Sequence, residues 1–536
     1  MYILLAILWL VWEIKYVLFW LYLWQLKDYH LPRFVDHFRT YKGKKLILNF
    51  EQILKLALFV FLFFTTSVPN LIYSVIFLVY LVELALFARG IINKSFKKPI
   101  KTAKILLLSA ISFVLLVLFF VFELGLSNNK QILSILISDI LTPIIVSVIV
   151  LLFQPIFVFL RNKTLRDAKE KIEKIKSAGS LKVIAITGSY GKTSTKEFLT
   201  TILSKKFKVL STNKHQNAEV GIANCILQDL NSSHQIFIAE VGAYDKGKVK
   251  EVCLVLKPQI GIVTGVNEQH LALFGSMKNL LSAEGGGELA NALPKDGLLV
   301  VNGDNKYCLG LYKEYAGNKK IYSISNKLID SDIWSEEVEV GKDFISFVAI
   351  NKNKEMAHFG VKVLGKQNVQ NLLGAILIAR ELGMNFEEIS EACNGIFQEQ
   401  AGMTLKQEKH EINVIDSSYS ANPDGVFADL EYLRIFEGEK VVVMPCLIEL
   451  GERSSEIHEK IGQKMGEICD LAIITSKDKY KEIEKGFNEK KLQGAKCLLC
   501  DNSQNIYSMI TLFCKQGDAV LLEGRVTQKL IDLLKQ

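Results

Sequence analysis

Residues 187–197 have the composition and spacing of a phosphate-binding loop. The sequence there is Thr187-Gly-Ser-Tyr-Gly-Lys-Thr-Ser-Thr-Lys-Glu197, and it lies between the strand-like run 183–186 and a predicted helix over 198–205. Glycines let backbone N–H groups approach phosphate oxygens, and the N-terminus of the following helix adds a positive dipole. Lys192 is placed to reach the terminal phosphates of a nucleotide, and the Thr193 hydroxyl can ligate Mg²⁺. The spacing GxxGKT is two residues shorter than usual, so the prediction depends on the strand-then-helix context.

Two further polar residues follow strand-like segments. Short apolar segments alternate with helical stretches after the loop, at 236–239, 260–263 and 298–301. This alternation predicts a doubly wound α/β domain with a parallel sheet. Glu240 directly follows the first segment, and His270 follows the second after a short loop. Because ligands of open α/β sheets bind at the carboxyl ends of strands, we expect both side chains to face the phosphate-binding loop as Mg²⁺ or phosphate ligands.

The first 160 residues differ in composition from the rest of the chain. The chain has 536 residues, too many for one core, and half of them are hydrophobic. Several apolar stretches are long enough, or nearly so, to span a bilayer, namely 2–25, 51–67, 69–90, 103–124 and 132–160. The sequence therefore predicts an N-terminal α-helical transmembrane bundle whose partner is the membrane lipid bilayer.

Positive charges indicate the orientation of this bundle. Lys and Arg concentrate in residues 26–50 and 89–104 and directly after residue 160, whereas the other two connections have almost none. With five spans, all three basic segments lie on one side, which the positive-inside rule places in the cytoplasm. The expected protein is a multi-pass protein of the cell membrane with its N-terminus outside and its catalytic domains cytoplasmic.

Two polar features of the bundle each have two interpretations. Glu13 and Lys15 interrupt the first span, either as a polar site or as a joint between two apolar pieces. Aromatic and basic residues from Lys27 to Arg33 lie at the predicted membrane surface, where they either anchor the chain or bind a lipid phosphate.

Other classes of site are disfavoured. The net charge of +8 lies largely beside the apolar stretches, and the soluble part has no basic stripe interleaved with aromatics. Nucleic acid is therefore not an expected partner. Cys497 and Cys500 form a CxxC pair within a strand-like run, which favours buried thiols over a zinc or redox site.

A series of segments in the soluble part occurs in an order and spacing typical of one family. These are Thr187-Gly-Ser-Tyr-Gly-Lys-Thr193, Asn217-Ala-Glu-Val-Gly221, Ala239-Glu-Val-Gly242, His270-Leu-Ala-Leu-Phe-Gly-Ser276, Asn302-Gly-Asp-Asn305, Gly365-Lys-Gln-Asn-Val-Gln-Asn371, Asp416-Ser-Ser-Tyr-Ser-Ala-Asn-Pro-Asp424 and Glu449-Leu-Gly451. With them, residues 181–536 resemble the Mur ligases, which join an amino acid or peptide to a carboxylate of a cell-wall precursor. The similarity is greatest to the branch that adds D-alanyl-D-alanine.

The resemblance implies a multi-domain fold. The expected parts are a transmembrane region over 1–163, a helical linker over 164–180, a central α/β ATP-binding domain over 181–396 and a Rossmann-like α/β C-terminal domain over 397–536. It also implies ATP and Mg²⁺ as cofactors and an acyl-phosphate mechanism, in which ATP activates the acceptor carboxylate before an amine attacks it.

The resemblance further assigns roles to individual residues. Lys192 holds the β- and γ-phosphates, while Thr193, Glu240 and His270 serve the magnesium ions. The remaining nucleotide-binding positions are Gly188, Ser189, Tyr190, Gly191 and Ser194 in the loop, Asn368 and Asn371 on the adenine side, and Asp416 at the ribose.

Three positions depart from the family pattern. Where the family has a carbamylated lysine, counting forward from His270 gives Glu284 and counting back from Glu288 gives Gly286. We prefer Glu284 as a catalytic residue, because its carboxylate resembles the end of a carbamylated lysine. In addition, Met403 stands where the family has a phosphate-contacting arginine, for which Lys406 or Arg525 would have to substitute, and Gln367 stands where it has a histidine.

The apolar stretches occupy the place of the family's soluble UDP-sugar-binding domain. One interpretation is that the acceptor is presented at the membrane on a lipid carrier, and the other is that the stretches only anchor the enzyme beside other cell-wall enzymes. The leading hypothesis is thus an amide-forming ligase for a membrane-associated precursor, with the amino acid or peptide as second substrate. The alternatives are a membrane-bound poly-γ-glutamate-like synthase and a catalytically impaired nucleotide-binding scaffold; a transporter is disfavoured because no ABC-type signature is present.

Overall fold

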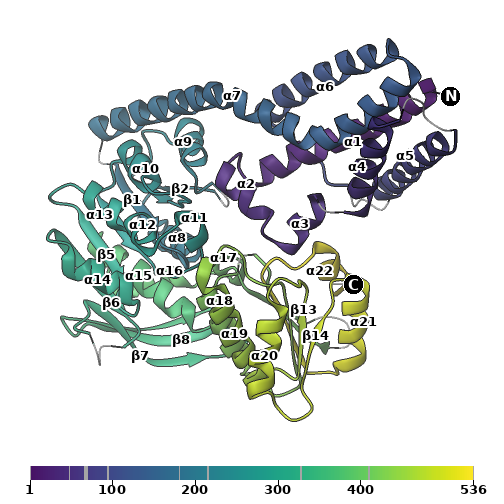
Figure 1. Cartoon of the computed structure of the whole chain (residues 1–536). Helices are drawn as coiled ribbons and strands as arrows, with labels where there is room; N and C mark the ends of the chain where they lie inside the picture. The colour runs from purple at the N-terminus through teal and green to yellow at the C-terminus, as the bar shows by residue number, and fades with distance from the viewer. Residues whose placement is uncertain are drawn as a thin grey trace. The chain divides into compact units, whose positions relative to one another are not determined.

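The computed structural model divides the chain into two compact units, Met1–Asn162 and Lys163–Gln536 (Figure 1). It describes residues 2–47, 49–65, 70–92, 96–179, 181–213, 216–325, 329–407, 411–419 and 421–534. The end of the predicted second span and the start of the third, at residues 66–69, lie outside the described residues.

The first unit consists of helices. Their bounds are α1 Tyr2–Leu26, α2 Leu31–His37, α3 Tyr41–Ile47, α4 Phe50–Phe63, α5 Asn70–Ile92, α6 Ala103–Leu124 and α7 Asn128–Ala178. Among the described residues, five helical segments are long and apolar enough to cross a membrane. Large apolar side chains also face outward, including Leu118 at 61% and Phe122 at 60% exposure. An outer surface of this kind is what contact with lipid requires.

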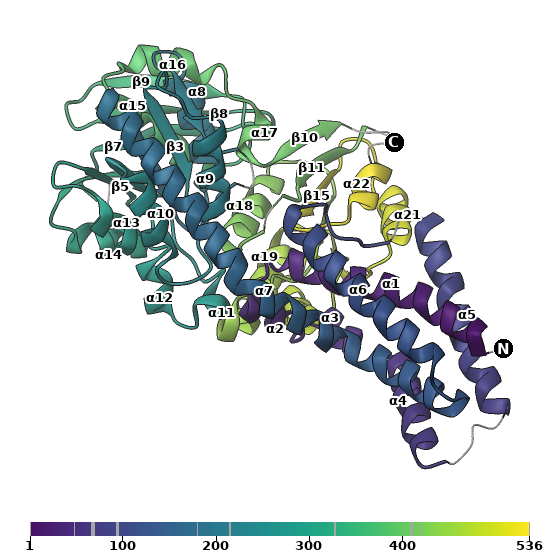
Figure 2. The same cartoon turned by 90° about the horizontal axis from the view of Figure 1, so that it is seen from above.

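Helix α7 is one continuous helix of 51 residues (Figure 2). The predicted last span and the predicted connector helix are therefore parts of a single element. Its C-terminal part, from Lys163 onward, belongs to the second unit, where Leu165, Ala168 and Ile172 are buried in the core. Their spacing of three and four residues places them on one helix face, while the charged residues of this part occupy the others.

A nine-stranded sheet forms the centre of the first part of the second unit, with the order β2-β3-β1-β4-β5-β6-β7-β8-β9. The strands from β2 to β7 in this order pair in parallel, whereas β7, β8 and β9 pair antiparallel. The bounds are β1 Lys182–Thr187, β2 Val209–Ser211, β3 Ile236–Glu240, β4 Ile260–Val263, β5 Leu298–Asn302, β6 Asn318–Ser323, β7 Ile333–Val340, β8 Ile345–Asn351 and β9 Met356–Val361. The predicted strands at 183–186, 236–239, 260–263 and 298–301 are all present.

Helices cover both faces of this sheet (Figure 1). They are α8 Lys192–Leu203, α9 Glu219–Gln228, α10 Lys248–Leu256, α11 Leu271–Phe274, α12 Met277–Ser282, α13 Gly287–Ala292, α14 Lys306–Glu314, α15 Gln367–Glu381, α16 Phe386–Cys393 and α17 Gln398–Ala401. In β1, Ile184 and Ile186 face one core, and Val183 and Ala185 face the other. A strand buried on both faces reads as a continuous apolar run, which explains its sequence.

A six-stranded sheet forms the C-terminal part, with the order β10-β11-β15-β12-β13-β14. Only β10 runs antiparallel to its neighbour. The strands are β10 Thr404–Gln407, β11 Asn413–Ser417, β12 Lys440–Met444, β13 Leu471–Ile474, β14 Lys496–Leu499 and β15 Ala519–Glu523. The helices are α18 Pro423–Leu433, α19 Ser454–Ile468, α20 Tyr480–Lys490, α21 Ser503–Phe513 and α22 Gln528–Leu534, with a short 3-10 helix, η2, at Gly451–Arg453.

Candidate functional site

The phosphate-binding loop connects β1 to α8, and two of its glycines are required by geometry. Gly188 and Gly191 have φ angles of 137° and 75°, in the region that favours glycine. A Cβ at Gly188 would lie 2.4 Å from Thr264 Oγ1, and one at Gly191 would lie 2.5 Å from Asn371 Oδ1. Helix α8 begins at Lys192, earlier than the predicted start at 198. Its N-terminal N–H groups therefore lie directly at the loop, as anion binding requires.

A hydroxyl and a carboxylate meet beside this loop. Thr193 Oγ1 donates a hydrogen bond of 3.1 Å to Glu240 Oε1, and Glu240 is buried at the carboxyl end of β3. The Lys192 ammonium donates to the carbonyl oxygens of Gly188 at 2.5 Å and Ser189 at 3.4 Å. Predicted phosphate-binding and magnesium-binding groups thus lie within one turn of α8.

Two residues that sequence reasoning did not assign hold Glu240 in place. Asn217 Nδ2 donates to Glu240 Oε1 at 3.0 Å, and Lys196 Nζ lies 3.6 Å from Glu240 Oε2. Lys196 is fully buried and also donates to the Thr212 carbonyl at 2.7 Å. An amide and a buried ammonium thus hold the Glu240 carboxylate beside Thr193. The available signal was the position of Lys196, four residues after Lys192 and so on the same face of the helix.

His270 and Glu284 form a second pair at the loop. His270 Nδ1 lies 3.0 Å from Glu284 Oε1, and Ser189 Oγ donates to Glu284 Oε2 at 3.1 Å. Burial alone would raise the pKa of Glu284, but the charge and hydrogen bond of His270, the charge of Lys192 and the Ser189 hydroxyl together lower it. The Glu284 carboxylate is thus held as an anion. Of the two sequence alignments, the one that selects Glu284 names the residue that contacts the loop.

Gly286 has a different local role. Its φ of 88° makes it the left-handed N-cap of α13, and a Cβ there would lie 2.4 Å from a Val263 methyl group. It is a turn glycine packed against β4.

The C-terminal domain also contributes to the surroundings of His270. Glu449 Oε2 lies 3.9 Å from His270 Nε2, and the Glu449 carbonyl accepts a hydrogen bond from the Ala272 amide at 3.0 Å. Glu449 has a φ of 68°, a strained conformation for a residue with a side chain. Strained backbone conformations are frequent at functional sites. Here the strained residue places a carboxylate of the C-terminal domain beside His270 of the middle domain.

Other predicted nucleotide-binding residues lie around the same loop. Asn371 Oδ1 accepts from Thr195 Oγ1 at 3.4 Å, and Asn371 Nδ2 donates to Asn368 Oδ1 at 3.0 Å. Asn368 Nδ2 in turn donates to the Leu364 carbonyl. The Ser194 hydroxyl donates to the Ala401 carbonyl at 3.2 Å, so it faces the segment that leads to the C-terminal domain.

Tyr190 and Asp416 each form hydrogen bonds within their own domain. Asn305 Nδ2 donates to the Tyr190 hydroxyl at 3.2 Å, and burial raises the pKa of that hydroxyl. Asp416 lies near the carboxyl end of β11, where its Oδ1 accepts from the Ser418 amide and hydroxyl.

The two other departures from the family pattern have structural explanations. Met403 is buried in the core of the C-terminal domain, whereas Lys406 and Arg525 are exposed. Gln367 donates a hydrogen bond of 2.9 Å to Asp429, a buried residue of α18. Neither Met403 nor Gln367 therefore supplies a charge to the loop.

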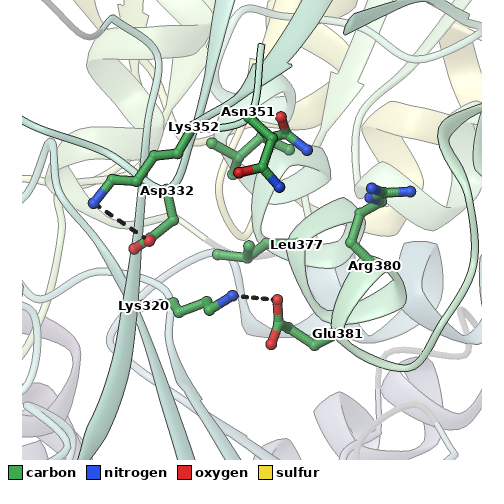
Figure 3. A pocket seen from close by; sticks show the side chains of 9 residues that line it. Lys320, Asp332, Asn351, Lys352, Leu377, Arg380 and Glu381 are labelled. Atoms are coloured by element: carbon green, nitrogen blue, oxygen red, sulfur yellow. Dashed lines mark hydrogen bonds and ion pairs between the residues drawn. The ribbon is translucent and has the colours of Figure 1, made fainter. Parts of the chain in front are cut away.

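A pocket of about 280 Å³ lies elsewhere in the middle domain (Figure 3). It is lined by residues of β6, β7, the turn after β8 and the C-terminal end of α15, the end opposite Asn368. Its charged side chains are all in ion pairs: Lys320 with Glu381 at 2.5 Å, Lys352 with Asp332 at 3.5 Å, and Arg380 with Glu355, which is not a lining residue. A charged ligand would have to break these ion pairs in order to bind, so we place the functional site at the phosphate-binding loop.

Two family models match the chain. The Mur ligase middle domain matches residues 186–379, and the Mur ligase glutamate ligase domain matches residues 403–526. A UDP-N-acetylmuramoyl-tripeptide–D-alanyl-D-alanine ligase of Haemophilus influenzae is 25% identical over 299 residues, which are 55% of this chain and 63% of that protein. The chain spans 59–63% of the length of three such relatives.

Solved structures share the fold of the second unit. MurF from Acinetobacter baumannii has a TM-score of 0.63 at 23% identity, over 70% of this chain and 81% of that chain. MurF ligase from Thermotoga maritima, solved in complex with ADP, has a TM-score of 0.59 at 22% identity, over 70% of this chain and 83% of that chain.

Proposed function

Because its middle and C-terminal domains belong to the Mur ligase family, we propose that this protein is an ATP-dependent ligase that joins an amino acid or peptide to a carboxylate of a membrane-associated cell-envelope precursor. The observation that carries this proposal is the glycine loop flanked by two polar pairs, Thr193 with Glu240 and His270 with Glu284. By analogy with its relatives, D-alanyl-D-alanine is the first amine to test.

The residues of the loop fit a nucleoside triphosphate and Mg²⁺. A side chain at position 188 or 191 would collide with Thr264 or Asn371. Because both positions are glycine, the backbone N–H groups of the loop remain accessible to phosphate oxygens. Thr193 and Glu240 are hard oxygen donors of the kind Mg²⁺ prefers. The described residues contain no cluster of three or more His, Cys, Asp or Glu suited to a metal. That agrees with Mg²⁺ sites that use one or two protein ligands and complete their shell with phosphate and water.

His270 is the other candidate ligand. Its Nδ1 is held by Glu284, which would leave Nε2 for a metal ion. A carboxylate behind a histidine fixes the orientation of the ring, an arrangement common among metal-binding histidines. Glu284 would then act both as a nearby anion and as the residue that orients His270.

The proposed reaction has two steps. The acceptor carboxylate attacks the γ-phosphorus of ATP, the bond to the β-phosphate oxygen breaks, and an acyl phosphate and ADP form. The amine then attacks the acyl carbon, loses a proton, and phosphate leaves with the electron pair of the C–O bond. Bound Mg²⁺ would neutralise phosphate charge in the first step. Lys192 and the amides of α8 would position the phosphates and neutralise the charge that develops on the transferred group.

The helical unit supports a location in the cell membrane. Its outward-facing apolar side chains and five candidate spans fit a bilayer, and the basic segments fit a cytoplasmic catalytic part. We propose that this unit brings the ligase to an acceptor at the membrane.

The test is a reconstituted reaction. The full-length protein in detergent is incubated with ATP, Mg²⁺, D-alanyl-D-alanine and a muramoyl-tripeptide acceptor, either UDP-linked or lipid-linked. Phosphate release and product mass are followed, with Lys192→Ala as the matched control. We expect product from at least one acceptor and loss of turnover in Lys192→Ala.

The arms separate the alternatives. Product from the lipid-linked acceptor alone would support presentation at the membrane, and product from the UDP-linked one would make the helical unit an anchor. A further arm contains ATP, Mg²⁺ and glutamate alone, and polymer formed there would favour the poly-amino-acid synthase. Nucleotide binding without product in any arm would overturn the ligase and favour a scaffold.

A further inference from the structure

A cluster of ionisable side chains lies inside the helical unit, far along the sequence from the phosphate loop. Lys55 of α4 contacts Glu83 of α5 at 2.9 Å and Asp139 of α7 at 2.5 Å. Glu13 of α1 contacts Thr142 of α7, one turn from Asp139. Four helices thus contribute to one cluster, which we name the acid–base centre: Glu13, Lys55, Glu83 and Asp139.

The acid–base centre is enclosed by the helices themselves. All four side chains are buried, with exposures of 2% or less. Glu13 and Glu83 lie near the middle of α1 and α5, so a bilayer around the unit would remove the centre still further from water. Ionisable groups in such positions are expensive to maintain and mark functional sites by default.

The charges of the acid–base centre do not balance. Three carboxyl groups surround one buried ammonium. A second cation, Lys15, is only half-buried, packs its Nζ 3.7 Å from the Trp12 ring, and interacts with Glu83 and with Glu51 at the start of α4. Even when Lys15 is counted, the carboxyl groups are in excess. A buried net charge of this kind is unstable unless a proton or another cation compensates it.

Asp139 is the carboxylate with the most donors. Its Oδ1 accepts from Trp9 Nε1 at 2.9 Å, and its Oδ2 accepts from the Tyr80 hydroxyl at 2.9 Å as well as from Lys55. Hydrogen bonds to the charged form favour that form. Asp139 and Lys55 are therefore the ion pair, and Glu13 and Glu83 supply the excess acid.

The contacts of the three carboxyl groups identify where a proton resides. Lys55 Nζ donates to Glu83 and to Asp139, so these two groups share the one fully buried ammonium of the centre. Glu13 Oε1 instead accepts a hydrogen bond from the neutral Thr142 hydroxyl. A buried carboxylate that receives a neutral donor rather than the ammonium is the least stabilised as an anion. Glu13 is therefore the group that holds the compensating proton.

We propose that the acid–base centre is a proton-binding site, in which Glu13 holds a proton beside the Lys55–Asp139 ion pair at neutral pH. The ligand is a proton rather than a metal ion, because Lys55 Nζ already occupies the space between Glu83 and Asp139. Pro143, which has no N–H to donate to the Asp139 carbonyl, weakens α7 at the level of the site.

The test detects the proton directly. Infrared spectra of the full-length protein in detergent are recorded at neutral pH for the wild type, Glu13→Gln and the control Glu51→Gln, which lies outside the acid–base centre. We expect the difference spectrum between wild type and Glu13→Gln to contain the carbonyl-stretch band of a protonated carboxylic acid, which shifts in D₂O, and the difference spectrum between wild type and Glu51→Gln to lack it. Absence of this band from the difference spectrum of Glu13→Gln would overturn the assignment to Glu13.

Thermal unfolding gives a second, independent readout. Glutamine resembles the protonated acid, so Glu13→Gln should keep the wild-type melting temperature at neutral pH, and at alkaline pH it should be more stable than the wild type. Asp139→Asn should melt well below the wild type throughout. A melting temperature of the wild type that rises with Na⁺ or K⁺ at fixed pH and ionic strength would identify a metal-ion site and overturn the proposal.

Discussion

Two regions of the molecule enclose a carboxyl group beside a cation, yet the carboxyl groups differ in charge. At the phosphate loop, Glu284 is surrounded by His270, Lys192 and Ser189, and the pKa of its carboxyl is lowered despite burial. In the acid–base centre, Glu13 accepts from the neutral Thr142 hydroxyl, while Lys55 donates to Asp139 and Glu83. The difference shows that burial alone does not set the charge of a carboxyl group. Charged neighbours and hydrogen-bond donors also set it, and at Glu284 these neighbours include the charges of His270 and Lys192.

The comparison predicts its largest effect for the lysine of the acid–base centre. Lys55→Met leaves Asp139 buried without its cation, and breaking a buried ion pair costs about 3–5 kcal/mol. We expect a strong fall in the melting temperature of the helical unit, measured by circular dichroism in detergent. The control is Lys98→Met, because Lys98 is exposed. Equal melting temperatures for both variants would show that Lys55 and Asp139 do not form the ion pair on which the comparison depends.

The same chemical change should have opposite results in the two regions. Glu284→Gln removes a charge that the site maintains, and we expect turnover to fall by roughly 10²–10³-fold, the loss typical of one preorganised electrostatic group. Glu13→Gln should leave turnover unchanged, since it replaces a group that is already neutral. The steady-state rate of phosphate release measures both.

Two controls make this contrast decisive. Glu314→Gln alters an exposed carboxylate of the middle domain and should behave like the wild type. The melting temperature of Glu284→Gln should remain close to that of the wild type, which separates loss of charge from loss of fold. Full turnover in Glu284→Gln would contradict its assigned role.

A third carboxyl cluster tests whether the membrane or the donors cause the difference. Asp429 and Glu523 are buried side by side in the soluble C-terminal domain, where Asp429 accepts from Ser417 and Gln367. Burial and the neighbouring carboxyl raise the pKa of Glu523 well above its usual value, and burial raises the pKa of Asp429. This pair should therefore resemble Glu13 rather than Glu284, although it lies outside the candidate membrane spans.

The expected sign follows from linkage. The folded protein binds these protons more tightly than the unfolded chain, so their contribution to stability is complete below the unfolded pKa and is lost as the pH rises through the folded pKa. Chemical unfolding from mildly acidic to alkaline pH should show declining stability. Glu523→Gln should flatten that decline, and an unchanged slope would contradict the assignment.

The sequence indicated that the residues around the phosphate-binding loop lie together, but it did not indicate the acid–base centre, for a physical reason. Lys192 and Thr193 are neighbours in a loop with a local pattern, and Glu240 follows from the rule that strand ends form sites. Lys55 and Asp139 are 84 residues apart, on helices whose packing no local pattern specifies. Glu13 stood out as a charge in an apolar run, but its partners did not.

The departures from the family show the same limit. The sequence favours Glu284 over Gly286 at the position of the family's lysine, because a carboxylate resembles the end of a carbamylated lysine. Only the fold shows that Glu284 contacts Ser189. That Met403 is a core residue and that Gln367 donates to Asp429 depend on the packing of the C-terminal domain, which sequence does not reveal.

The smallest effect is expected where the charges remain in water. Arg453 joins Glu268 across the middle and C-terminal domains at 2.6 Å, but 39% of its side chain is exposed. Exposed ion pairs contribute about 0.2–1 kcal/mol, because solvent screens both charges in the folded and unfolded states. Arg453→Ala should therefore change the free energy of unfolding by no more than about 1 kcal/mol, measured by denaturant titration. A loss of stability as large as that expected for Lys55→Met would contradict this prediction. It would show that exposure to solvent does not weaken the contribution of an ion pair to the stability of this protein.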